Sequence, residues 1–149
     1  MENQKQNEDI IYLIKCLDKE LAKDFDKRLA EFGLTGQQGR VLFFIKCQTK
    51  NGIVIHQNDI EKNFNLSKST VSGLVDRLVK KGLIERVIES PYVCLVPTEK
   101  GKNIVETIHS HKDQTIKKLT RNLSPEDVER MTQNIKLLIS NIKEEEENV

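Results

Sequence analysis

Residues 67 to 81 read SKSTVSGLVDRLVKK and have the periodicity of a helix. Their apolar side chains fall at i, i+3, i+4 and i+7, which places Val71, Leu74, Val75 and Leu78 on one face. The opposite face carries only small, polar or charged residues: Ser69, Ser72, Gly73, Asp76, Arg77 and Lys80. The pattern therefore predicts a helix with one buried face and one slim polar face that points outward.

The segments on both sides of this helix predict a small composite motif. A short helix is expected over Gln57 to Phe64, and a brief turn at 65–67 separates it from the first. Gly82 is a suitable left-handed terminator, and the residues after it change from a helical to a strand pattern. Runs of β-branched and aromatic residues at 83–88 and 92–96 predict a β-hairpin. Two helices, a tight turn and a hairpin together predict a winged helix-turn-helix.

Longer helices are predicted before this motif. Apolar residues recur every three or four positions from Ile10 to Phe32, so a helix is expected over about residues 8 to 32, before Gly33. The next helix begins at Thr35, where Gln38 completes a capping box, and ends near residues 51–52.

The last third of the chain is predicted to be helical as well. Thr98 is a suitable cap for a helix that contains Ile104, Val105, Ile108 and Leu119. Ser124 and Pro125 mark the start of a final helix with a coiled-coil-like apolar stripe of Val128, Met131, Ile135, Leu138 and Ile142. We therefore expect one mainly α domain over 1–149, with a β-hairpin wing. It would combine a winged helix-turn-helix at about 35–100 with a dimerisation lobe of helices at about 8–32 and 98–147.

Composition indicates a water-soluble chain with a basic centre. The 149 residues carry a net charge of only +1, but residues 62 to 86 hold six basic and two acidic side chains. The longest apolar run, 41–45, is far too short to span a membrane, and the polar start does not resemble a secretory signal. We expect a cytoplasmic protein with no membrane partner. Its three cysteines contain no C-x-x-C pair and are expected to be reduced, with Cys47 and Cys94 in the core.

The slim face of residues 67 to 81 has the properties of a helix that enters the major groove of double-stranded DNA. Small side chains allow close approach, and hydroxyl groups can hydrogen-bond to base edges. Gly73 costs about 1 kcal/mol inside a helix, and close approach to DNA would explain its presence. The expected base contacts are Ser67, Ser69, Thr70 and Ser72, and the expected phosphate contacts are Lys62, Lys68, Arg77 and Arg86. Asp76 is expected to pair with Arg77 or Arg86, or to accept from a cytosine amino group.

Six short motifs occur in order across the centre of the chain. They are Gln57-Asn58-Asp59-Ile60, Leu66-Ser67, Ser69-Thr70-Val71-Ser72, Val75-Asp76-Arg77-Leu78, Lys81-Gly82-Leu83-Ile84-Glu85-Arg86 and Thr98-Glu99-Lys100-Gly101. With Leu34-Thr35 and the flanking helices, they resemble the multiple-antibiotic-resistance regulator (MarR) family. The resemblance implies a homodimer held by its first, fifth and sixth helices. It also implies a repressor that is often released by a small phenolic or lipophilic effector.

The expected wing departs from that family. Family wings carry an aspartate and arginines at the tip, whereas the tip here is Glu89-Ser90-Pro91-Tyr92, which is shorter and has no basic side chain. Arg86 at its base, together with Ser90 and Tyr92, is left to contact DNA. This departure leaves an alternative open, in which the winged helix is a protein-interaction module without sequence-specific DNA binding.

Other chemistries are weaker interpretations of the sequence. No nucleophile elbow, P-loop or zinc-protease motif is present, so no enzyme and no cofactor are expected. His109 and His111 point in different directions on a helix, so no metal site is expected. Cys16 on the first helix leaves a thiol-based redox sensor as a second alternative, although burial is the better interpretation.

Overall fold

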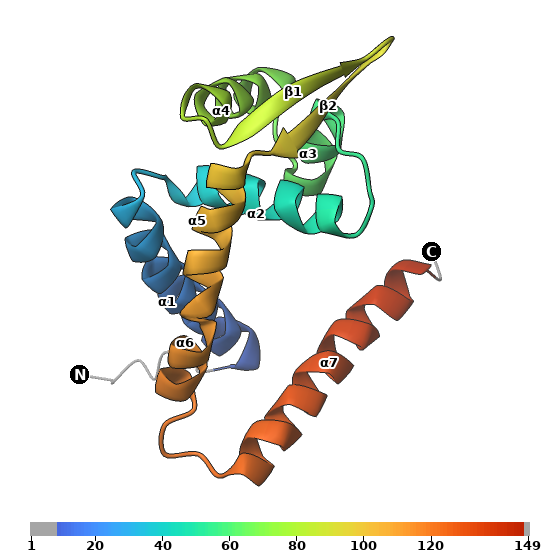
Figure 1. Cartoon of the computed structure of the whole chain (residues 1–149). Helices are drawn as coiled ribbons and strands as arrows, with labels where there is room; N and C mark the ends of the chain where they lie inside the picture. Colours follow the sequence, from blue (N-terminus) through green and yellow to red (C-terminus); the bar gives the residue numbers. More distant parts are fainter. Residues whose placement is uncertain (1–8, 148–149) are drawn as a thin grey trace, which may run out of the picture. The chain divides into compact units, whose positions relative to one another are not determined.

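The computed structural model describes residues 9–147 and contains seven helices and one hairpin within them (Figure 1). The elements are α1 (Ile10–Glu31), α2 (Gly36–Lys50), α3 (Gln57–Phe64), α4 (Lys68–Lys80), β1 (Ile84–Glu89), β2 (Tyr92–Pro97), α5 (Glu99–Ser110), α6 (Lys112–Leu119) and α7 (Pro125–Glu147). They divide into two compact units, Met1–His109 and Ser110–Val149, which are described separately. The mainly helical fold with a two-stranded wing confirms the predicted fold class.

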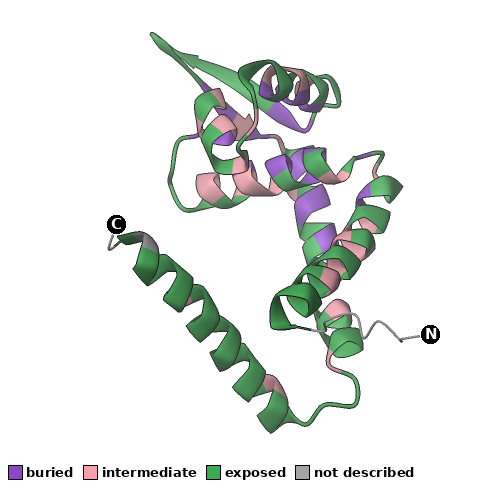
Figure 2. Ribbon diagram, turned by 180° about the vertical axis from the view of Figure 1, so that it is seen from behind, coloured by how far each residue is buried: buried purple, intermediate pink, exposed green. Residues whose placement is uncertain are grey.

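The core of the first unit is built from the predicted helix faces. Val71, Leu74, Val75 and Leu78 of α4 are all buried, as their spacing predicts. They belong to one cluster with buried residues of the other elements, namely Leu29, Leu34, Val41, Leu42, Ile45, Ile55, Ile60, Leu83, Ile84, Leu95, Ile104, Val105 and Ile108. Figure 2 shows these buried positions concentrated where the helices and the hairpin meet. The packing therefore holds α4 with its polar face outward.

Side-chain caps fix the ends of the helices at the predicted residues. Thr35 and Gln38 form the reciprocal capping box of α2, each bond being 3.2 Å long. The hydroxyl of Thr98 accepts a hydrogen bond from the Gly101 N–H at 3.1 Å and so caps α5. Gly82 adopts φ +72°, the left-handed conformation expected at the end of α4.

The hairpin follows α4 directly and lies beside it (Figure 1). Its register pairs Ile84 with Pro97 and Glu89 with Tyr92. An isolated antiparallel bridge between Ile55 and Leu95 ties the segment before α3 to β2. The base of the wing is thus connected to both helices of the helix-turn-helix.

Gly101 provides a test of this packing. A side chain at this position would overlap the backbone carbonyl oxygen of Leu83, which cannot move without shifting the start of β1. We expect Gly101→Ala to lower the free energy of unfolding by about 1–3 kcal/mol, as overpacking does. Urea unfolding measures this change, and equal stability of the two proteins would contradict the described contact between α5 and the hairpin.

Two sequence-based expectations for the remaining helices are wrong. The single helix expected from Thr98 to Leu119 is divided at His111 into α5 and α6. The buried face of α5 ends at Ile108, whereas Ile116 and Leu119 of α6 are exposed, so no common core requires one continuous helix.

Cys47 is exposed rather than buried, because it lies away from the face of α2 that buries Val41, Leu42 and Ile45. Cys94 is buried, as predicted.

The second unit contains α6 and the long helix α7. Ser124 caps α7 by accepting the Asp127 N–H at 3.1 Å, as expected. Figure 2 shows α7 exposed along nearly its whole length. The exposed residues include Met131, Ile135, Leu138 and Ile142 of the predicted stripe, which are 40–65% exposed. Over residues 9–147, no helix is long and apolar enough to be a membrane span.

Candidate nucleic-acid interface

The exposed face of α4 is the candidate interface. Its first turn presents Lys68, Ser69 and Thr70 to solvent, and Ser72 and Gly73 are half-buried on the next turn. Ser67, just before the helix, is also exposed. The structure therefore brings the predicted base contacts together at the N-terminal end of a helix, the end that meets base edges in helix-turn-helix proteins.

Three hydroxyl groups at the start of α4 form a local network. Ser67 Oγ donates to Thr70 Oγ1 at 2.8 Å and accepts the Thr70 N–H at 3.2 Å, which makes Ser67 the N-cap. The Ser67 and Ser69 hydroxyl oxygens are 3.3 Å apart. Ser67 therefore has a structural role as the helix cap, in addition to its predicted role as a base contact. The network also orients Thr70 and Ser69 before any partner binds.

Gly73 differs from two other helical glycines in its surroundings. Side chains at Gly39 and Gly101 would overlap Leu29 and the Leu83 carbonyl, so packing explains those two glycines. A Cβ atom at Gly73 would meet only the Arg77 guanidinium, at an ordinary distance of 3.6 Å. Nothing within the described residues requires glycine there, although it weakens the helix by about 1 kcal/mol. Close approach to an external partner would account for it.

An ion pair links the interface to the wing. Arg86 of β1 binds the carboxylate of Asp76 on α4, which agrees with one of the pairings expected from the sequence. The two side chains are 37% and 63% exposed, respectively. The pair offsets the negative charge of Asp76 on this face and anchors β1 to α4. A phosphate contact by Arg86, as predicted, would have to share the guanidinium with Asp76.

The remaining basic residues divide into structural and available ones. Lys81 donates from Nζ to the Gly33 carbonyl and, at 3.1 Å, to Gln38 Oε1, so it ties the end of α4 to the start of α2. Within residues 9–147, no ion pair involves Lys62, Lys68, Arg77 or Lys80. These four cations remain available to neutralise phosphates. Lys80 is an additional candidate, and its place on the outer face was visible in the sequence.

The wing tip carries apolar rather than basic groups. Ile88 and Tyr92 are 79% and 65% exposed, and Ser90 is exposed at the turn. The Tyr92 ring packs edge-on against His56, with ring centres 5.8 Å apart. The structure therefore places Ser90 and Tyr92 at the tip, beyond Arg86 at the base, and charge at the interface comes from α3, α4 and β1.

Cys94 Sγ lies 3.8 Å from His56 Nε2, a cysteine–histidine contact between β2 and the residue before α3. Burial, followed by the nearby charge of Glu89, raises the pKa of the Cys94 thiol, which disfavours the thiolate. Cys16 is half-buried, and its hydrogen bond with Tyr12 is the main cause that raises the pKa of that tyrosine. Among the described residues, no group of three or more His, Cys, Asp or Glu side chains could hold a metal ion.

Comparisons with known proteins give a consistent result. A model of the MarR family matches residues 32–92, the segment that contains the helix-turn-helix and most of the hairpin. No curated protein matches the sequence significantly.

Solved structures extend the similarity beyond the matched segment. The chain resembles MepR, a transcription regulator of the Staphylococcus aureus multidrug efflux pump MepA, with 28% identity and a TM-score of 0.76 over 90% of this chain and 98% of that one. It also resembles the S. aureus MepR–DNA complex, with 29% identity and a TM-score of 0.68 over 90% and 96% of the two chains. Oxidised MarR from E. coli shares the fold, with 23% identity and a TM-score of 0.74 over 88% and 94%.

Proposed function

We propose that the chain is a transcription regulator of the MarR family, a cytoplasmic repressor that binds a pseudo-palindromic operator as a homodimer. The observation that carries the proposal is the slim outer face of α4, where Gly73 has no packing role and the hydroxyl residues surround it. The S. aureus MepR–DNA complex supports it, since a related chain of the same fold occurs there with DNA.

The exposed apolar residues of α1 and α7 support a dimer. Five large apolar residues at the start of α1, which are Ile10, Ile11, Leu13, Ile14 and Leu17, are 43–63% exposed, and four residues of the stripe on α7 are exposed to a similar degree. Exposed apolar surface of this extent is unusual in a soluble monomer and marks an interaction site. In a twofold dimer, two copies of α4 would enter successive major grooves about 34–36 Å apart.

Regulation by an effector follows from this arrangement. A small phenolic or lipophilic molecule bound among apolar residues of α1, α2 and α5 would change the spacing of the two α4 helices. An effector that binds more tightly to a dimer whose spacing does not match the operator lowers the affinity for DNA. The size of this loss is set by the ratio of the effector's affinities for the two spacings. Such a ligand would release the repressor.

A mobility-shift assay tests the function directly. We expect the protein to retard DNA from upstream of its own gene in the presence of excess competitor DNA, with affinity falling steeply as salt rises. A protein-interaction module, which the short wing tip without a basic side chain favours as the second candidate, would show no preference over competitor DNA. Footprinting with and without candidate phenolic compounds then locates the operator and identifies release.

Lys68 offers a quantitative test of the phosphate contacts. It lies at the first position of α4, exposed and without an ion pair among the residues described. Lys68→Gln should weaken binding to all sequences by a similar factor. The slope of log affinity against log salt should fall in magnitude by about 1 for each phosphate that the protein no longer neutralises. Lys50→Gln, an exposed substitution at the end of α2, is the control, and an unchanged slope for Lys68→Gln would contradict the assignment.

A further inference from the structure

The end of α4 is bound to the turn between α1 and α2. Lys81, the C-cap of α4, donates from Nζ to the Gly33 carbonyl and, at 3.1 Å, to Gln38 Oε1. Gln38 is only 6% exposed, and its Oε1 also accepts the Thr35 N–H at 3.2 Å. Hydrogen bonds from an ammonium group are stronger than those from a neutral donor. One side chain therefore joins α4 to the two helices that come first in the chain.

The backbone that follows α4 is bound by the start of α5. Lys100 Nζ donates to the Lys81 carbonyl at 3.1 Å, and the Thr98 hydroxyl donates to the Gly82 carbonyl at 2.6 Å. The Thr98 N–H donates to the Leu83 carbonyl at 3.0 Å. We call these three carbonyl-bearing residues the α4 anchor. Directional hydrogen bonds connect the anchor both to the α1–α2 turn and to α5.

The position of the anchor gives it control over the reading end of α4. At the other end of the helix, the Ser67 cap is a local bond to Thr70, three positions along the chain. Ser69 lies about 18 Å from Lys81 along the helix, at 1.5 Å per residue. A swing of about 10° around the anchor would move Ser69 by about 3 Å, which is close to the rise of one base pair. A small change of angle at the anchor thus becomes a shift of about one base pair at the DNA.

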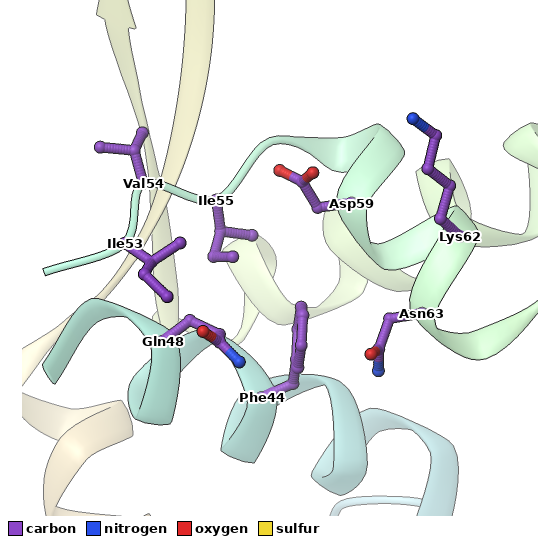
Figure 3. Close-up of a pocket in the computed structure, with 8 residues that line it drawn as sticks. All are labelled: Phe44, Gln48, Ile53, Val54, Ile55, Asp59, Lys62 and Asn63. Carbon is purple, nitrogen blue, oxygen red and sulfur yellow. The ribbon is translucent and has the colours of Figure 1, made fainter. Parts of the chain in front are cut away.

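Open space beside α3 leaves room for such a swing. α3 packs against α4, and it meets α2 where the Phe44 and Phe64 rings lie edge to face, with centres 5.5 Å apart. Beside this contact, a pocket of about 410 Å³ remains between the end of α2 and α3, and Figure 3 shows the Phe44 ring pointing into it. Because this space is not filled, packing against α2 restricts the angle of the α3–α4 pair less than a close-packed core would.

We propose that Lys81 is a positioning residue that fixes the angle of α4 and, through it, the spacing between the two reading helices of a dimer. The inference rests on the proposed function, because it assigns to Lys81 a part in selecting the operator. Lys81 acts through α4 and not on DNA, since its ammonium is bound to Gly33 and Gln38. Lys80 beside it has no ion pair among residues 9–147 and is a candidate phosphate contact. The two adjacent lysines therefore have different roles.

Removal of the Lys81 ammonium should make the spacing of the reading helices less defined. Each α4 would then adopt a range of angles, of which only some match the operator. If the matching angle is occupied about one third of the time in each protomer, the affinity of the dimer falls about tenfold. The same freedom would let the dimer adapt to half-sites that are one base pair too close or too far apart. Affinity and selectivity for spacing should therefore fall together.

Lys81→Met tests this role, because methionine keeps an apolar stem and removes the donor. A mobility-shift assay would compare the operator with two derivatives that have one base pair added or removed between the half-sites. We expect the unaltered protein to bind the derivatives at least about thirtyfold more weakly than the operator. Lys81→Met should bind the operator about tenfold more weakly, and its penalty for the derivatives should shrink at least about threefold.

Three comparisons separate positioning from other roles. The salt slope of Lys81→Met should be unchanged, because no phosphate contact is lost. Lys80→Met, the same substitution at the exposed neighbour, should lower the magnitude of the slope and keep the full spacing penalty. Lys81→Arg should retain most of the spacing penalty, because a guanidinium can donate to both acceptors. A smaller salt slope or a full spacing penalty in Lys81→Met would overturn the proposal.

A measurement without DNA separates this inference from the proposed function. Spin labels on Ser69→Cys and Lys50→Cys report the distance between α4 and α2 within one chain. The full chain would carry Cys16→Ser and Cys47→Ser, and labelled protein would be diluted with unlabelled protein. Lys81→Met should broaden the distribution of this distance by about 3 Å.

The two measurements fail in different ways. If the distribution broadens but the protein binds no operator, the proposed function is wrong and the positioning role is supported. If operator binding is normal and Lys81→Met changes neither the distribution nor the spacing penalty, the positioning role is wrong and the function stands.

Discussion

Gly73→Leu is expected to make the protein more stable and, at the same time, to lower its affinity for operator DNA at least about a hundredfold, or about 2.7 kcal/mol. Stability should rise by about 0.5–1 kcal/mol, because leucine is a much better helix former than glycine. The structure offers no internal obstacle, since the nearest atom to a Cβ at this position is the mobile guanidinium of Arg77. The leucine side chain would instead occupy the space between α4 and the floor of the major groove.

Opposite signs for the two effects are what make this variant informative. A substitution that damages the fold lowers stability and DNA affinity together, whereas Gly73→Leu should separate them. Urea unfolding measures stability, and a mobility-shift assay at fixed salt measures affinity. Gly73→Ala should show the same stability gain with a smaller loss of affinity. Asn103→Leu, an exposed substitution on α5, controls for an added surface leucine. Unchanged operator affinity in Gly73→Leu would show that this face of α4 does not approach DNA.

The helices and the wing could be predicted because local signals specify them. The spacing of Val71, Leu74, Val75 and Leu78 defines the buried face of α4, and the start of α2 follows from the capping box of Thr35 and Gln38. Each signal lies within a few residues of the element that it determines. The structure confirms both features.

Contacts between distant residues could not be predicted in the same way. Lys81 binds the Gly33 carbonyl, 48 positions away, and no local pattern distinguishes it from the available Lys80 beside it. The pairing of Asp76 with Arg86 was one of three expected outcomes, because only the geometry of α4 against β1 selects it. The pocket beside α3 was not predicted, because it depends on how the segment before that helix lies across α2.

The failed predictions have a related cause. Cys47 follows the apolar run 41–45 closely in sequence, but residues two positions apart on a helix point in different directions, so Ile45 is buried and Cys47 is exposed. The break between α5 and α6 depends on where the core ends, after Ile108, and sequence periodicity does not report the size of the core. Side-chain exposure and helix continuity are therefore tertiary properties, and they limit what a single sequence reveals.

Ile135→Asp is expected to convert the protein from dimer to monomer at micromolar concentration and to weaken operator binding at least about a hundredfold. Ile135 lies in the middle of the apolar stripe of α7 and is 47% exposed. In a twofold seam each substitution occurs twice, so two carboxylates would be buried close together among apolar side chains, at a cost of several kcal/mol. Sedimentation velocity measures the assembly state, and a mobility-shift assay measures the affinity for DNA.

The loss of DNA binding should follow from the loss of the dimer and not from damage to α4. A monomer would contact only one half-site. In a dimer that is bound at one half-site, the second α4 helix is held at a high effective concentration near the other half-site, and a monomer would lose this advantage. Gln133→Asp, an exposed position on the other side of α7, adds the same charge with the same helix-propensity cost and should leave the dimer intact. If Ile135→Asp remained a dimer with normal affinity, the stripe on α7 would not be the dimer seam. If it became a monomer that still bound the operator normally, the twofold interpretation of a pseudo-palindromic site would be wrong.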